Sequence, residues 1–354
     1  MTRPVLTVFG PSGGGTEHEE GRHPERPARV EAAMAGVADL GSELGSDLAL
    51  VAAAPAPREA LLRVHSVRYL ERLEAMARSG GGDLDPDTFV RPDSWDVALR
   101  SAGAGLQAME LLRRDGAGVA FAATRPPGHH ALVDTGMGFC LLNNVAVTAA
   151  ALTAAGERVL IVDWDVHHGN GTQDIFWDDP SVLYVSTHQS PFYPGTGAAE
   201  EVGGAGAPGL TVNVPLPAGA TGDVVRRALD EVAAPVIEQF GPTWVLISAG
   251  FDAHRDDPLG ELALSAGDYG NLARTVAGYA PAGGRLIVFL EGGYDLDAVR
   301  ASVTATLGAL VGAEGAVSGV GADGGEASTS GGPGMDAVAW AGVAREQALE
   351  HGSE

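Results

Sequence analysis

The stretch Gly156–Gln173, GERVLIVDWDVHHGNGTQ, decides the fold that we expect for this chain. Its apolar, β-branched run Val159–Val162 is typical of a buried strand in a parallel sheet. Asp163, Asp165 and His167 alternate at the end of this run. The two-residue period of an extended chain directs their side chains to the same side. They therefore predict a metal site at the C-terminal end of a strand, where open α/β sheets bind ligands.

Carboxylate and imidazole ligands without a thiolate favour zinc or a similar divalent ion. The simpler alternative is a strand end whose carboxylates only cap the following helix. The chain has a single cysteine, Cys140, which excludes an internal disulfide framework and any metal site built from several thiolates.

The composition fits one enzyme-sized globular body. The chain has 354 residues, and 45% of them are hydrophobic, which is enough for a sizeable core. The formal net charge of −24 argues against nucleic-acid binding, because phosphates would be repelled. Such acidity mainly promotes solubility, although it is compatible with a cationic substrate. With no apolar run near the ~20 residues of a membrane span and no signal-peptide layout, we expect a cytoplasmic protein without membrane contact.

Strand-like and helix-like segments alternate along the chain, which predicts a doubly wound, mainly parallel sheet with helices on both faces. Residues 80–94, rich in Gly, Pro and Asp, are expected to form an irregular exposed loop, and Pro235 is expected to kink a helix over 223–240. The expected strands are 5–9, 118–123, 159–162, 182–186, 210–214, 244–248 and 286–290, and the other expected helices are 28–40, 58–78, 94–114 and 143–155.

Ionisable side chains follow four of these strands. Because the C-terminal ends of parallel strands gather at one edge of a sheet, side chains from distant parts of the chain can converge there. The residues concerned are His129 and His130, then Asp163, Asp165 and His167, then Asp252, and finally Tyr294. Taken singly, each has a plainer explanation, such as a helix cap for Asp252 or a surface loop position for Tyr294.

Together, these residues describe metal-assisted hydrolysis of an amide or similar acyl group. Asp165, His167 and Asp252 supply the three protein ligands that catalytic zinc usually takes. A general base is then useful beside the metal, and the tandem histidines provide one. Asp163 could orient one imidazole and raise its pKa. Tyr294 follows two glycines, so its phenol could donate to a developing oxyanion.

The motifs that carry these residues resemble those of the zinc-dependent histone deacetylase family, nearest its class II and bacterial histone deacetylase-like amidohydrolase branch. The resemblance covers roughly residues 5–310 and implies a single-domain, arginase-deacetylase-like α/β fold. The motifs are HPERP at 23–27, RPPGHH at 125–130, GFCLLNN at 138–144, DWDVHHGNGTQ at 163–173, FYPGTG at 192–197, AGFDAH at 249–254 and EGGY at 291–294.

The resemblance implies a role for each matching position. Asp165, His167 and Asp252 match the zinc ligands, and Tyr294 matches the residue that polarises the substrate carbonyl. His129 and His130 match the histidines that activate water and protonate the leaving amine, with Asp163 orienting the first. Substrate-binding positions are Gly138, whose carbonyl accepts the amide N–H, Phe139 and Tyr193 as channel walls, and Gly292 and Gly293. A structural potassium ion is expected at Asp163, Asp165, His167, Ser186 and Thr187.

Two positions depart from common family patterns. Asn170 stands where class I members carry an aspartate opposite the second histidine, so the charge support for His130 should be weaker. Tyr193 stands where many members have a phenylalanine, and its hydroxyl should make the channel more polar. This second difference raises the possibility of a preference for polyamines or other small amides.

The sequence therefore predicts a zinc amidohydrolase that deacetylates an acylated primary amine, either acetyl-lysine or a small molecule. An acetylpolyamine amidohydrolase is the alternative within the same chemistry, and a non-catalytic acyl-lysine binder is the alternative outside it. The sequence leaves open zinc against iron, and the oligomeric state. We expect the catalytic domain over residues 1–311, a flexible Gly/Ala-rich tether over 312–334, and a C-terminal helix within 335–354.

Overall fold

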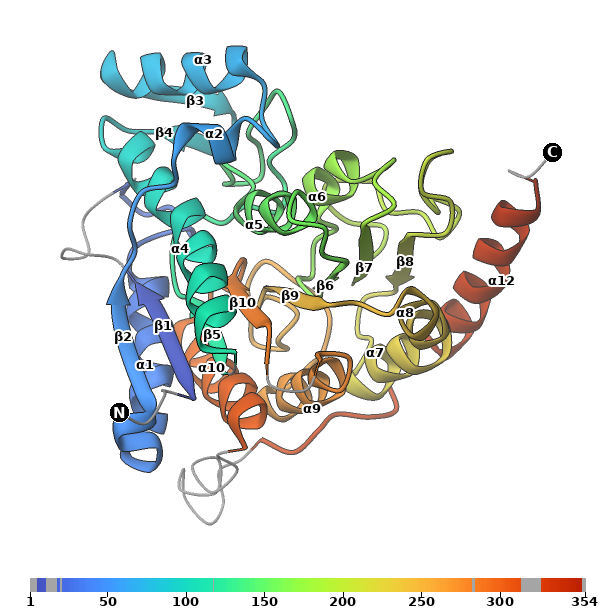
Figure 1. Ribbon diagram of the computed structural model, residues 1–354. Helices are drawn as coiled ribbons and strands as arrows, with labels where there is room; N and C mark the ends of the chain where they lie inside the picture. Colours follow the sequence, from blue (N-terminus) through green and yellow to red (C-terminus); the bar gives the residue numbers. More distant parts are fainter. Residues whose placement is uncertain are drawn as a thin grey trace.

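A parallel sheet runs through the middle of the molecule (Figure 1). The computed structural model describes residues 5–10, 18–19, 21–116, 118–281, 284–312 and 326–351. Within these residues, eight strands pair in the order β2-β1-β5-β10-β9-β6-β7-β8, every pair parallel. The strands are β1 (Leu6–Gly10), β2 (Leu48–Ala52), β5 (Val119–Ala122), β6 (Val159–Asp163), β7 (Val182–Gln189), β8 (Thr211–Leu216), β9 (Trp244–Ala249) and β10 (Leu286–Leu290).

Helices cover both faces of this sheet, as a doubly wound topology requires. The longer helices are α1 (Ala28–Leu44), α3 (Val67–Arg78), α4 (Ser94–Asp115), α5 (Asn144–Thr153), α9 (Ala266–Ala277), α10 (Leu296–Val311) and α12 (Met335–His351). The short ones are η1 (Gly45–Asp47), α2 (Arg58–Leu61), α6 (Asn170–Ile175), α7 (Gly222–Ala228), η2 (Leu229–Ala233) and α8 (Ala234–Phe240).

Alternate residues of the central strands enter two separate hydrophobic cores. In β6, Leu160 and Val162 pack in the core that includes α1, α7, α9, α10 and α12. Val159 and Ile161 point to the opposite core, which includes α3, α4 and α5. Because both faces are covered, the strand has no polar face, which explains its continuous apolar run. The predicted doubly wound, mainly parallel sheet is confirmed.

Two local expectations were wrong, and one strand was not predicted. Residues 80–94 are not irregular throughout, because β3 (Gly82–Asp85) and β4 (Thr88–Val90) form an antiparallel hairpin whose second strand is buried. Strand β2 was missed, since its partly exposed residues become a strand only by pairing with β1. The helix expected over 58–78 is two helices, since Ser66 caps a new helix by accepting from the backbone N–H of Tyr69.

The kink expected near Pro235 takes the form of a π-helical turn. This turn, η2, separates α7 from α8, and Pro235 lies in the first turn of α8. Proline lacks a backbone N–H and cannot continue the normal helical hydrogen-bond pattern, so the helix is interrupted just before it.

The C-terminal segment returns to the body of the domain. Residues 313–325 of the expected tether lie outside the described residues. The remainder is attached, because Glu326 accepts a hydrogen bond from His254 at 2.8 Å and Thr329 donates one to Asp268 at 2.7 Å. The helix α12 then covers the edge strand β8 (Figure 1), where Arg345 donates to the backbone carbonyls of Gly209 and Thr211. Among the described residues, no helix combines the length and apolarity needed to cross a membrane.

Helix α4 packs unusually close to its neighbours at two glycines. A Cβ at Gly103 would lie 1.9 Å from the carbonyl oxygen of Ala54, and one at Gly105 would lie 2.5 Å from the ring of Phe289. Such distances are far below van der Waals contact. These positions therefore fix the approach of α4 to the sheet and to the β2–α2 connection.

We predict opposite stability effects for two Gly→Ala changes in helices. Gly103→Ala should lower the free energy of unfolding by about 1–3 kcal/mol through overpacking. Gly41→Ala in α1 is the matched control, because the nearest atom to its new Cβ is 3.9 Å away; it should raise that free energy by up to about 1 kcal/mol through helix propensity. Urea unfolding monitored by circular dichroism measures both, and equal midpoints for the two variants would refute this account of α4 packing.

Candidate active site

Four neighbouring strands deliver the ionisable residues to one edge of the sheet. Strands β5, β10, β9 and β6 are consecutive in the sheet, and each is followed by one group of the predicted site residues. His129 and His130 follow β5, Tyr294 follows β10, Asp252 follows β9, and Asp165 with His167 follow β6. The parallel arrangement therefore places them together, although they are far apart in sequence.

Asp165, His167 and Asp252 form a compact cluster whose ligand atoms all lie within 4.8 Å of one another. Nδ1 of His167 lies 3.1 Å from Asp165 Oδ1 and 3.2 Å from Asp252 Oδ2. Backbone amides hold the two carboxylates, since Gly292 N donates to Asp165 Oδ2 at 2.8 Å and Val166 N donates to Asp252 Oδ1 at 2.9 Å.

The cluster fits a bound divalent cation. Asp252 Oδ2 is buried and has no hydrogen-bond partner among the described residues. Burial and the nearby charge of Asp165 raise the pKa of Asp252 to about 7, because two buried carboxylates tolerate each other poorly without a cation. Glycine at position 292 allows the carboxylate to approach the backbone this closely, because a Cβ there would lie 1.9 Å from Asp252 Oδ2.

The tandem histidines have different partners. His129 Nδ1 lies 3.0 Å from Asp163 Oδ2, and His130 Nδ1 lies 2.8 Å from Asn170 Oδ1. Burial opposes protonation of His129, but the charges of Asp163 and Asp165 outweigh it and raise the pKa of His129 well above its ordinary value. Burial, reinforced by the charge of His129, lowers the pKa of His130 well below its ordinary value. His130 is therefore the neutral ring of the pair.

Tyr294 is buried at 9% exposure and lines the same cavity. Burial raises the pKa of its phenol well above the ordinary value, although Arg29 opposes this. The Arg29 guanidinium lies 4.8 Å from the centre of the Tyr294 ring and donates to the carbonyl of Gly293 at 2.5 Å. The phenol is thus a neutral hydrogen-bond donor.

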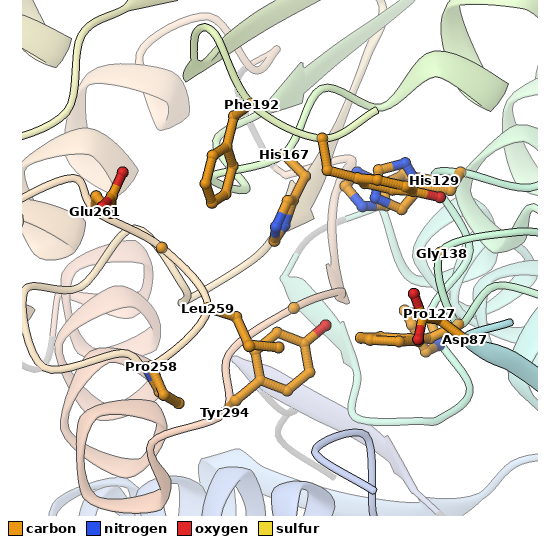
Figure 2. A pocket seen from close by; sticks show the side chains of 15 residues that line it. Asp87, Pro127, His129, Gly138, His167, Phe192, Pro258, Leu259, Glu261 and Tyr294 are labelled. Carbon is orange, nitrogen blue, oxygen red and sulfur yellow. The ribbon is translucent and has the colours of Figure 1, made fainter. Parts of the chain in front are cut away.

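A cavity of about 430 Å³ opens above these groups (Figure 2). The Phe192 ring is stacked on His167 at 5.3 Å, while the Tyr193 ring meets His130 edge-on at the same distance. The hydroxyl of Tyr294 points into the middle of the group. The lining residues are Asp87, Pro127, His129, His130, Gly138, Phe139, His167, Phe192, Tyr193, Pro258, Leu259, Gly260, Glu261, Gly292 and Tyr294.

Two glycines of the site are required by close approach. Gly138 has φ +55°, and a Cβ there would lie 2.4 Å from the His130 ring. Gly293 has φ +118°, a backbone conformation that favours glycine. Two of the three predicted substrate-binding glycines, Gly138 and Gly293, are therefore positions at which a side chain would distort the site.

The residues expected to bind potassium lie on β6, on β7 and just after β6. Asp163 and Ser186 are register partners on these adjacent strands, with Thr187 next along β7. Ser186 Oγ lies 2.9 Å from His188 Nδ1. Potassium binding itself stays a prediction.

Sequence reasoning missed four buried charged residues that support the site. A buried ion-pair network lies beneath Tyr294. In this network, Glu25 forms ion pairs with Arg29, at 3.2 Å, and with Arg125. Glu291 accepts hydrogen bonds from the backbone N–H groups of Gly128, at 2.7 Å, and His129, at 3.2 Å. The signal was present for three of these residues, because Glu25 lies in HPERP, Arg125 in RPPGHH and Glu291 in EGGY.

Comparison with known proteins agrees with this geometry. The family described as "Histone deacetylase domain" matches residues 23–310. "Probable deacetylase" of Archaeoglobus fulgidus is 41% identical over 285 residues, covering 79% of each chain. "Histone deacetylase-like amidohydrolase" of Pseudomonas aeruginosa is 42% identical over 258 residues, covering 72% of this chain and 68% of the relative.

A solved structure extends the match to the fold. The structure titled "Crystal Structure of HDA15 HD domain" superposes with a TM-score of 0.84 at 35% identity, covering 99% of this chain and 98% of the other. The fold, the strand-end cluster and the family match over most of the sequence lead to one conclusion: this chain belongs to the histone deacetylase family and is an enzyme of the deacetylase and amidohydrolase type.

Proposed function

We propose that the chain is a zinc-dependent amidohydrolase that removes acetyl or other acyl groups from an acylated primary amine such as acetyl-lysine. The observation that carries the proposal is the convergence of three groups on one cavity: the Asp165, His167 and Asp252 cluster, the neutral His130 ring, and the Tyr294 phenol. Oxygen and nitrogen ligands on a buried three-residue cluster suit zinc with one coordination place open.

Zinc held by Asp165, His167 and Asp252 would supply Lewis-acid polarisation of the substrate carbonyl and acidify a water molecule. The chain itself must then supply proton transfer and charge stabilisation. Both functions have candidates within the cavity, namely His130 and Tyr294.

His130 is suited to general acid and base catalysis. Its Nδ1 faces Asn170 Oδ1, an acceptor, so Nδ1 carries the proton and Nε2 is free to take one from water. The proton can then pass to the nitrogen of the leaving amine. His129, paired with Asp163, is the charged member and contributes electrostatic stabilisation rather than proton transfer.

Tyr294 is suited to stabilise the oxygen of the substrate carbonyl as negative charge develops on it. Its phenol stays protonated, and Arg29 beneath the ring adds positive charge nearby. A hydrogen bond that strengthens as the charge grows lowers the barrier more than it stabilises the bound substrate.

The shape of the cavity favours a linear aliphatic amine. Phe139, Phe192 and Tyr193 present aromatic walls, and Gly138 brings its backbone into the lining, where its carbonyl can accept the amide N–H of the substrate. Acetyl-lysine has such a chain.

We further propose structural potassium at Asp163, Asp165, His167, Ser186 and Thr187.

The second candidate is hydrolysis of acetylpolyamines. It is favoured by the hydroxyl of Tyr193 and by two exposed carboxylates in the cavity lining, Asp87 and Glu261, because a polyamine retains positive charges beyond the acetylated nitrogen. A non-catalytic acyl-lysine binder would have lost a ligand, a histidine or the tyrosine, and this chain retains every one.

Replacing either His130 or Tyr294 should remove most of the activity. We predict that Tyr294→Phe and His130→Ala each lower kcat on an acetyl-lysine peptide by at least about 100-fold, because each removes stabilisation made in the transition state. Zinc content, measured by mass spectrometry, should remain unchanged. Tyr279→Phe, at a partly exposed tyrosine outside the cavity lining, is the control and should retain wild-type kcat. Near-native turnover of either active-site variant would contradict the assigned roles.

Removing the hydroxyl of Tyr193 tests whether it influences the choice between acetyl-lysine and acetylpolyamine substrates. We predict that Tyr193→Phe raises the ratio of kcat/KM for acetyl-lysine peptides over acetylpolyamines by about 3- to 10-fold, the worth of one hydrogen bond of about 1 kcal/mol. Wild type and variant are compared on the same panel of both substrate classes. An unchanged ratio would show that this hydroxyl does not select the substrate.

A further inference from the structure

One buried carboxylate, that of Asp257, holds the backbone of Tyr294 from another part of the chain. Oδ2 of Asp257 accepts hydrogen bonds from the backbone N–H of Tyr294 at 2.6 Å and of Asp295 at 3.1 Å. Its other oxygen, Oδ1, accepts from the backbone N–H of Leu259 at 2.9 Å. Asp257 is only 6% exposed. One side chain therefore joins two segments separated by 37 residues.

Both joined segments belong to the substrate cavity. Pro258 and Leu259 form part of its wall, and Tyr294 provides its phenol. Figure 2 shows Pro258 and Leu259 on the same side of the cavity as Tyr294. The carboxylate therefore connects the backbone of Tyr294 to a wall of this cavity.

Tyr294 needs such support because of what precedes it. Gly293, directly before Tyr294, has φ +118° and no side chain that could pack against its surroundings, and its carbonyl accepts a hydrogen bond from Arg29. On the other side, Asp295 caps α10 by accepting from Ala298 N at 2.8 Å. The two backbone N–H groups that donate to Asp257 Oδ2 lie just before the N-terminus of α10, where a negative charge is favourable.

We propose that Asp257 is a positioning residue for Tyr294, setting the phenol at the place where it can donate to the substrate oxygen. This inference rests on the proposed role of Tyr294. It assigns to Asp257 no contact with substrate or metal, and it predicts that the effect of Asp257 on turnover passes through the phenol.

Asp257→Asn tests this with little change in side-chain volume. The carboxylate accepts three N–H bonds through two oxygens. An amide offers one oxygen and one NH₂ donor, so in either orientation at least one backbone N–H faces another donor. The variant should therefore release either the Tyr294 segment or the Leu259 segment.

The experiment is a double-mutant cycle of Asp257→Asn with Tyr294→Phe, measuring kcat and KM on an acetyl-lysine peptide. We expect Asp257→Asn alone to lower kcat by about 10- to 100-fold, with KM within about threefold of wild type. In the Tyr294→Phe background the same change should lower kcat less than about twofold, because no phenol remains to be positioned. Asp256→Asn, whose side chain is 62% exposed, is the matched control and should leave kcat unchanged.

Two results would overturn the inference. Wild-type kcat in Asp257→Asn would show that the hydrogen bonds from Asp257 do not influence catalysis. An equal loss of kcat in both backgrounds would show that Asp257 acts on the fold or the metal instead. Zinc content and thermal unfolding are measured for every variant. If Asp257→Asn does not fold, Asp257→Glu, which keeps the charge but displaces the oxygens, is carried through the same cycle and judged by the same criterion. Native turnover in Tyr294→Phe alone would refute the proposed function rather than this positioning role.

Discussion

The active site depends on two carboxylates, Asp165 and Asp252, that are fixed beside His167 in the interior of the protein. Buried carboxylates repel each other strongly unless a cation or donors compensate them. The fold compensates them in part with the backbone amides of Gly292 and Val166. One oxygen of Asp252, Oδ2, accepts no hydrogen bond from the described residues, although it lies 3.2 Å from Nδ1 of His167. The sheet holds this arrangement together, because β6 and β9 are adjacent and parallel.

The remaining charges are divided around this cluster in a way that suits amide hydrolysis. On one side, His129 pairs with Asp163, while His130 faces the neutral Asn170, which leaves its other ring nitrogen available for the proposed proton transfer. On the other side, Arg29 lies beneath Tyr294 and is itself fixed by buried Glu25. The partners of His129, His130 and Tyr294 thus favour one protonation state of each side chain before substrate binds, and such preorganisation makes electrostatic catalysis effective.

The sequence predicted the parallel sheet and the residues at its strand ends, because both follow from local patterns: apolar runs for the strands and ionisable residues directly after them. It could not predict features that depend on pairing across the chain. The buried hairpin strand β4 is too short to stand out beside its prolines, and Phe192 gives no sign that it stacks on His167. The partner of Asp257 lies 37 residues away, and nothing in either segment indicates the contact.

The most direct test of the account is zinc K-edge X-ray absorption on the purified protein loaded with one equivalent of zinc. We expect one tightly bound zinc per chain, with only oxygen and nitrogen neighbours at about 2.0–2.2 Å and the signature of a single imidazole. Asp252→Asn should weaken zinc binding in a competition with a chelator. A sulfur neighbour at about 2.3 Å, which would implicate Cys140, or several imidazoles, or no stoichiometric zinc at all, would contradict the assignment of Asp165, His167 and Asp252 as the metal site.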